Sequence, residues 1–105
     1  MWICDPMHGN TRGTAGGRKT RSVDDIYHEL KVSIDTHARC KTHLGGVHFE
    51  LTGEDVTECV GGASGITEAD LDLNYSSALD PRLNYAQSLE LAFLLAERMK
   101  PEHNI

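Results

Sequence analysis

The sequence contains no apolar run approaching the roughly 20 residues that a membrane-spanning helix needs, so we expect no membrane partner. It also has few cysteines, and the three present, Cys4, Cys40 and Cys59, show no C-x-x-C spacing. The number of cysteines is odd, they follow no metal-site or redox-motif spacing, and no basic and apolar signal peptide precedes them. This pattern favours free thiols in a reducing compartment. We therefore expect a cytoplasmic protein in which Cys4 and Cys59 pack rather than bind a metal.

Positive charge is scarce. The 105 residues contain 10 Lys and Arg against 16 Asp and Glu, which gives a formal net charge of −6. A nucleic-acid-binding protein needs a basic face to displace phosphate counterions, so this composition argues against that class. The one basic cluster, residues 12–21, either holds an anion such as a phosphate ester or is a mobile, solvated loop. Its glycines match neither G-x-x-x-x-G-K-[ST] nor G-x-G-x-x-G, so they do not indicate a nucleotide site.

The sequence does contain alternating strand and helix patterns, within a length that allows one domain at most. Three strands are expected, at 1–4, where both faces are buried, at 47–52 and at 75–79. Two long helices are expected, one at 23–38 capped by Ser22 and one that Asn84 caps and Pro101 ends, with a short helical turn at 67–71. A glycine-rich loop at 9–21 and a turn at 42–46 connect them. This alternation predicts an α/β fold with about three parallel strands and crossover helices.

Each predicted strand ends near a side chain that can bind a metal. His8 follows the first strand, Glu50 lies near the end of the second, and Asp80 follows the third. The carboxyl ends of parallel strands lie on the ligand-binding side of an α/β sheet, so the three side chains can converge there. One imidazole and two carboxylates suit manganese or iron better than zinc. We expect a divalent metal site, with a fourth ligand from elsewhere.

Each of these residues also has an ordinary structural explanation. A His after a strand is usually a polar turn residue, a strand Glu can face solvent at a sheet edge, and Asp before Pro commonly starts a turn. His48 shares a strand face with Glu50 and can be a ligand, a partner that orients a ligand, or a core histidine. We favour the orienting role for His48, and Asp5 can orient His8 in the same way.

Five segments carry a family resemblance: "WICDPMHGNT", "RKTR", "THLGGVHFELTGEDVTEC", "DPRLN" and "QSLELAFLLAE". In this order they span essentially the whole chain, which resembles the C-terminal end of the class II 3-deoxy-D-arabino-heptulosonate 7-phosphate (DAHP) synthases. The resemblance implies that residues 1–105 are the C-terminal portion of a (β/α)8 TIM barrel, corresponding to strands six to eight and their helices. It also implies that an earlier barrel portion is missing, and that the full-length protein is a homo-oligomer.

The resemblance also implies an activity and a site. Family members are transferases that condense phosphoenolpyruvate with erythrose 4-phosphate, the first step of the shikimate pathway to chorismate and the aromatic amino acids. They hold a divalent metal, often manganese or cobalt, by a cysteine, a histidine, a glutamate and an aspartate. The last three correspond to His8, Glu50 and Asp80. Lys19 corresponds to a lysine near the aldose phosphate, and Arg21 is a further candidate for substrate binding.

The chain departs from the family in lacking a counterpart of the metal-binding cysteine and of most phosphoenolpyruvate-binding residues. Two alternatives follow from this departure. One is a non-catalytic fragment or split subunit that is inactive alone. The other is a different metal-dependent barrel enzyme, such as a hydrolase that uses a metal-bound water as nucleophile.

Overall fold

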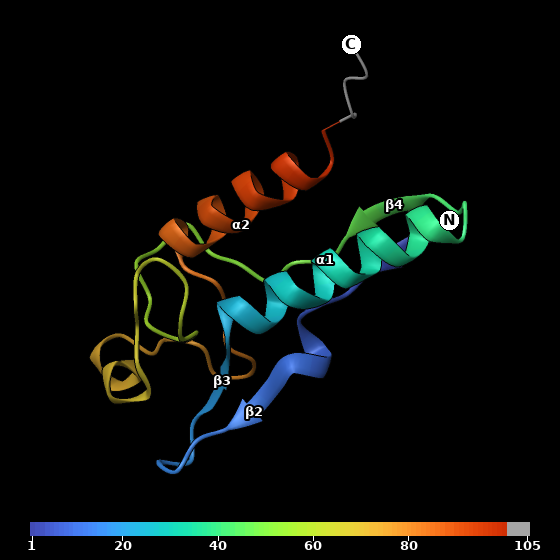
Figure 1. Ribbon diagram of the computed structural model, residues 1–105. Helices are drawn as coiled ribbons and strands as arrows, with labels where there is room; N and C mark the ends of the chain where they lie inside the picture. The colour runs from blue at the N-terminus through green and yellow to red at the C-terminus, as the bar shows by residue number, and fades with distance from the viewer. Residues whose placement is uncertain (101–105) are drawn as a thin grey trace.

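Two parallel strands joined by a helix form the frame of the protein. The computed structural model describes residues 1–100, in which strand β1 (Trp2–Cys4) pairs in parallel with β4 (Leu44–Val47). Helix α1 (Val23–Arg39) makes the crossover between them, close to the predicted 23–38. Figure 1 shows β1 and β4 beside α1, with helix α2 alongside. The predicted α/β class with parallel strands is confirmed.

Side chains at the helix starts fix where the helices begin. The Ser22 hydroxyl accepts a hydrogen bond from a backbone N–H in the first turn of α1, as its position predicts. Asn84 precedes α2 (Tyr85–Arg98) and forms a capping box with Gln87, in which each side chain accepts from the other residue's backbone N–H, at 2.8 and 3.0 Å. The predicted short helical segment between them is the 3-10 helix η2 (Glu68–Leu73).

Strand β4 begins earlier than the predicted 47–52, because the glycine pair assigned to a turn lies inside it. These glycines sit directly against β1. A Cβ added to Gly45 would lie 2.6 Å from Cγ of Met1, and one added to Gly46 would lie 2.9 Å from Cδ1 of Ile3. Glycine at these two positions lets side chains from the neighbouring strand segment approach the β4 backbone closely. In the sequence alone, the same glycine pair indicates a turn.

The predicted loop at 9–21 is instead mostly an antiparallel hairpin of β2 (Thr11–Gly13) and β3 (Lys19–Arg21), which follows the short 3-10 helix η1 (His8–Asn10). The hairpin loop is closed where the backbone N–H of Thr14 donates to the carbonyl of Arg18 at 2.9 Å. Each strand is three residues long and carries no apolar alternation, so the sequence gives little sign of it.

The predicted strand at 75–79 is wrong, since that segment forms no regular structure. A third parallel contact is made further along the chain, where Leu83 and Leu51 form an isolated bridge. The backbone N–H of Leu83 donates to Glu50 at 3.0 Å, and that of Thr52 donates to Leu83 at 2.9 Å. The parallel pairing within residues 1–100 is thus one ladder and two isolated bridges, the second between Ser22 and Val60, rather than three full strands.

The core joins β1, both long helices and the connecting segments, and consists of Cys4, Met7, Val23, Ile26, Leu30, Cys59, Leu83 and Leu91. The packing roles expected of Cys4 and Cys59 are thereby confirmed. Strand β1 is not buried on both faces as predicted, because Trp2 and Ile3 are 60% and 54% exposed. The strand's apolar sequence cannot reveal this, since it requires covering elements on both sides.

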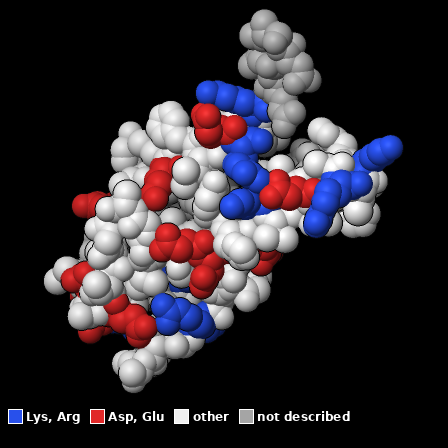
Figure 2. Space-filling view, viewed as in Figure 1, with Lys and Arg blue, Asp and Glu red and all other residues white. Residues whose placement is uncertain are grey.

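Charges of both signs are mixed on the surface. Figure 2 shows Lys and Arg scattered among Asp and Glu on one face, without a continuous basic surface over it. Among residues 1–100, no helix is both long enough and apolar enough to cross a bilayer. Pro101, the predicted end of the last helix, lies outside the described residues.

Candidate metal centre

His8 is held by the turn that follows β1. The Asp5 carboxylate accepts from the backbone N–H of Met7 at 2.9 Å and of His8 at 3.3 Å, and its other oxygen lies 2.6 Å from Nδ1 of His8. Partial burial raises the pKa of Asp5, but these hydrogen bonds outweigh it and hold the pKa below its usual value. Because the ionised carboxylate can only accept, this contact favours the tautomer of His8 with the proton on Nδ1, and that tautomer leaves Nε2 as a ligand atom.

Glu50 follows β4 and faces His8. Its carboxylate oxygen Oε1 lies 3.4 Å from Nε2 of His8 and accepts a hydrogen bond from Nη1 of Arg21 at 2.8 Å. The Glu50 backbone carbonyl accepts from Leu83, so the residue is fixed by the parallel bridge beside it. The side chain is partly exposed, and its carboxylate therefore remains accessible from the side of His8.

Asp80 reaches the same place from a loop rather than from a strand end. Its carboxylate is partly exposed and lies 3.6 Å from the ammonium of Lys19. The loop is held from inside by Glu58, whose side chain is fully buried. The Glu58 carboxylate accepts from the backbone N–H groups of Ser76 and Ser77 and from both the backbone and the guanidinium of Arg82, at 2.8 to 3.2 Å.

The structure brings His8, Glu50 and Asp80 together. One ligand atom from each of these side chains lies within 4.8 Å of the other two. A second group of this kind within residues 1–100 consists of Asp5, His8 and His48, all exposed. The two groups share His8, whose ring centroid is 5.8 Å from that of His48. The first group combines three separate segments of the chain, whereas the second already uses Asp5 to orient His8.

Lys19 and Arg21 are two residues apart in β3, so their side chains lie on the same face of the strand, but the surroundings of the two side chains differ. The side chain of Lys19 is 60% exposed beside Asp80. The side chain of Arg21 is fully buried and contacts Glu50. A dissolved phosphate can therefore reach the Lys19 ammonium directly, whereas the Arg21 guanidinium is covered by protein.

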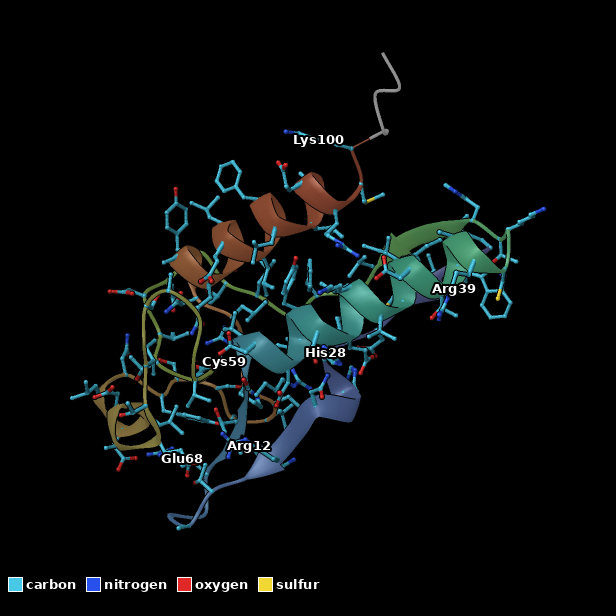
Figure 3. All side chains as sticks on the ribbon, viewed as in Figure 1. Arg12, His28, Arg39, Cys59, Glu68 and Lys100 are labelled. Atoms are coloured by element: carbon cyan, nitrogen blue, oxygen red, sulfur yellow. The ribbon has the colours of Figure 1, made fainter. Side chains whose placement is uncertain are left out.

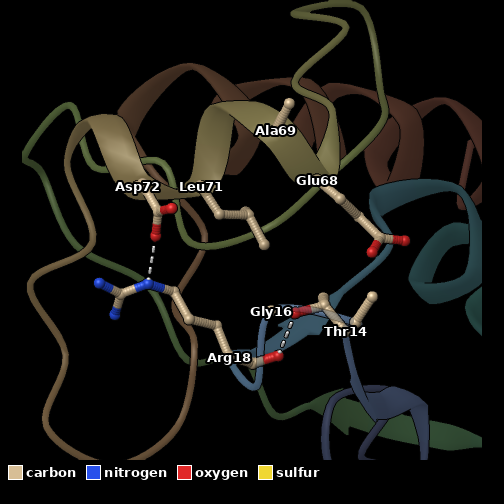
Figure 4. Close-up of a pocket in the computed structure, with 8 residues that line it drawn as sticks. Thr14, Gly16, Arg18, Glu68, Ala69, Leu71 and Asp72 are labelled. Atoms are coloured by element: carbon tan, nitrogen blue, oxygen red, sulfur yellow. Dashed lines mark hydrogen bonds and ion pairs between the residues drawn. The ribbon is translucent and has the colours of Figure 1, made fainter.

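Contacts with η2 place the hairpin that carries Lys19. In Figure 4, Arg18 and Asp72 line a cavity of about 220 Å³ and contact each other, with Nε of Arg18 2.6 Å from the carboxylate. In Figure 3, Arg12 of the hairpin points toward Glu68 of η2, and the pair is 3.0 Å apart. None of the three converging ligand residues lines this cavity. Its ion pairs serve to fasten the hairpin.

Two residues important to the site were missed by the sequence reading. Glu58 lies between the predicted strand at 47–52 and the predicted helical turn at 67–71, and Thr11 lies in the predicted loop at 9–21. The one available signal for Glu58 was its position among apolar neighbours, Val56, Cys59 and Val60. A charged residue in such surroundings is buried only when it is paired, which hints at a partner without identifying it.

A family model described as the class-II DAHP synthetase family matches residues 1–96. The chain belongs to the class-II DAHP synthetase family. The family resemblance read from the five sequence segments is thereby confirmed.

Curated relatives agree with this assignment. The chain is 54% identical over 102 residues to a Neurospora crassa phospho-2-dehydro-3-deoxyheptonate aldolase, covering 97% of this chain and 21% of the relative. It is also 54% identical over 101 residues to proteins of the same name from Streptomyces coelicolor and Streptomyces lividans, covering 96% of this chain and 22% and 69% of those relatives, respectively. The chain thus spans about a fifth of the length of the first two, and its similarity concerns that portion of them.

Proposed function

We propose that this chain is part of a DAHP synthase, a transferase that condenses phosphoenolpyruvate with erythrose 4-phosphate at the entry to aromatic amino acid biosynthesis. The observation that carries the proposal is the convergence of His8, Glu50 and Asp80 in a chain of this family. Residues 1–105 then supply strands six to eight of a (β/α)8 barrel, and further protein supplies the rest within a homo-oligomer. The absence of a disulfide within residues 1–100 suits a cytoplasmic enzyme.

His8, Glu50 and Asp80 would hold a divalent metal, with Mn²⁺ favoured and Co²⁺ as the alternative. The donor set fits, because one imidazole nitrogen and two carboxylate oxygens match the preferences of these ions. The contact from Asp5 to His8 is the kind of hydrogen bond that fixes a metal-binding imidazole in the correct tautomer. Bound there, the metal would supply Lewis-acid polarisation of the aldehyde carbonyl.

Lys19 would bind the phosphate of erythrose 4-phosphate. Its ammonium is exposed next to the metal site, and the hairpin that carries it is fastened by ion pairs. A lysine serves here as a compact point charge. Arg21, the other expected substrate contact, is fully buried and is better suited to a role inside the protein.

We expect the chain alone to be inactive as a synthase. The residues described contribute three metal ligands, and the fourth ligand and most phosphoenolpyruvate contacts expected from the family lie elsewhere. The alternative of a split subunit or non-catalytic fragment makes the same prediction for the isolated chain. A test must therefore place the chain in a complete barrel.

A chimera provides this test. The segment of the Streptomyces coelicolor relative that aligns with this chain is replaced by residues 1–105, and metal-dependent consumption of phosphoenolpyruvate is measured in the presence of erythrose 4-phosphate. We expect activity, its loss in the His8→Ala chimera, and a Lys19→Ala chimera whose KM rises more for erythrose 4-phosphate than for phosphoenolpyruvate. His28→Ala, an exposed change on α1, is the matched control. Full activity of the His8→Ala chimera would refute the assignment.

A further inference from the structure

One buried side chain touches all three segments that bring the candidate ligands together. Nε of Arg21 donates to the Thr11 hydroxyl at 2.8 Å. Nη1 donates both to the Glu50 carboxylate at 2.8 Å and to the backbone carbonyl of Pro81 at 2.9 Å. The Arg21 guanidinium therefore links the first hairpin strand, the segment after β4, and the loop before α2.

These contacts lie next to the ligands in the sequence. Thr11 is three residues after His8, Pro81 directly follows Asp80, and Glu50 is itself a candidate ligand. A shift of any of the three segments would stretch a hydrogen bond to the same planar group. The positions of the ligands relative to one another are thus tied to one rigid side chain.

The backbone of Arg21 is fixed as firmly as its side chain. It pairs with Thr11 across the hairpin, and its carbonyl accepts from the N–H of Val60 at 2.9 Å. The remaining amino group, Nη2, is buried and makes no hydrogen bond within residues 1–100. An unpaired buried donor destabilises the folded state, and the hydrogen bonds of the rest of the guanidinium offset that cost.

We propose that Arg21 is a positioning residue that sets the spacing of His8, Glu50 and Asp80 and does not contact substrate. This inference rests on the proposed metal site. Arginine suits the role because its planar fork presents N–H donors in fixed directions, and here the N–H groups of two nitrogens, Nε and Nη1, serve three acceptors. Lysine offers a single flexible ammonium and cannot reproduce this geometry.

The test is Mn²⁺ binding by the full 105-residue chain, followed by electron paramagnetic resonance of the free ion, together with the visible spectrum of bound Co²⁺. Outer residues that orient metal ligands typically change metal affinity by about 10- to 100-fold. We expect Arg21→Lys to weaken Mn²⁺ binding within this range and to alter the Co²⁺ spectrum. Arg39→Lys, a change at an exposed arginine near the end of α1, should leave both unchanged.

Thr11→Val is a milder variant. It tests the positioning role of Arg21 if the Arg21→Lys variant does not fold. It removes one acceptor, and we expect about tenfold weaker Mn²⁺ binding with an altered Co²⁺ spectrum. In a folded Arg21→Lys background it should add little, because Thr11 acts through Arg21. Folded variants with wild-type affinity and spectrum would overturn the positioning role. A wild-type chain that binds no Mn²⁺ would instead overturn the metal site itself, and the inference with it.

Discussion

Replacing Glu58 by Gln should release the loop that carries Asp80. The Glu58 carboxylate is fully buried and accepts five hydrogen bonds, two at Oε1 and three at Oε2. A glutamine keeps the volume and one oxygen, so both bonds at Oε1, from the backbone and Nε of Arg82, can persist. At the other position an amide NH2 would face the N–H groups of Ser76 and Ser77 and the Arg82 guanidinium, which are all donors.

The expected cost follows from this count. Hydrogen bonds to charged groups contribute about 1.5–3 kcal/mol each, and removing one partner of a buried ion pair typically costs about 3–5 kcal/mol. Arg82 is partly exposed and can regain water, which reduces the penalty. We therefore expect Glu58→Gln to lower the free energy of unfolding by about 3 kcal/mol.

The pH dependence supplies an independent check. Burial raises the pKa of Glu58, but the hydrogen bonds from Arg82, Ser76 and Ser77 outweigh it, so the pKa in the folded state lies below its usual value. A lowered pKa stabilises the folded state above the unfolded-state pKa of about 4.3, and this stability is lost as the pH falls toward the folded-state pKa. The Glu58→Gln variant should therefore lose less stability than the wild type on acidification below about pH 4.

Urea unfolding followed by circular dichroism at neutral and acidic pH measures both effects. Glu68→Gln is the matched control, because Glu68 and its partner Arg12 are both exposed and such pairs contribute about 0–1 kcal/mol. A Glu58→Gln variant as stable as this control, with the acid dependence of the wild type, would refute the anchoring role of Glu58.

Two further predictions concern the backbone and the thiols. Gly61→Ala should destabilise the chain by about 1–3 kcal/mol in thermal unfolding, because Gly61 has φ +84° and an added Cβ would clash with a neighbouring carboxylate, whereas Gly13→Ala, with open space around it, should be nearly neutral. Equal effects of the two changes would contradict the left-handed conformation. A thiol reagent at mildly alkaline pH should modify exposed Cys40 quickly and Cys59 only after unfolding, since burial raises the pKa of Cys59 to about 12. Equally rapid modification of both in the folded chain would contradict the burial of Cys59.

The helices could be predicted from the sequence because their signals are local. Ser22 and Asn84 mark the two long helices through hydrogen bonds to residues within the next turn. The parallel pairing of β1 and β4 followed from the crossover helix between them. These features depend on residues that are near one another in the chain, so the local sequence pattern is enough to predict them.

The strand positions could not be predicted because tertiary contacts decide them. Gly45 and Gly46 lie in a strand whose partner, β1, brings the side chains of Met1 and Ile3 close against them. Residues 75–82 form a loop because a carboxylate from a distant segment, Glu58, accepts their backbone and side-chain donors. Neither partner is visible in the local sequence.

The candidate site shows the same division. The sequence singles out His8, Glu50 and Asp80 because a metal site needs those residue types after strands. Asp80, however, arrives from a loop anchored by the buried Glu58 carboxylate rather than from a strand end. The burial of Arg21 was also unpredictable, since arginine is rarely buried unless it is paired, and its partners lie far away in the sequence.

Titration of the 105-residue chain with Mn²⁺, followed by electron paramagnetic resonance of the free ion, tests most directly whether these residues form a metal site. The account predicts one site per wild-type chain, with binding weakened at least about tenfold by His8→Ala, Glu50→Ala or Asp80→Ala, because each change removes a ligand atom. His28→Ala should bind as the wild type does. Wild-type affinity in all three ligand variants, or no binding by the wild-type chain, would contradict the account.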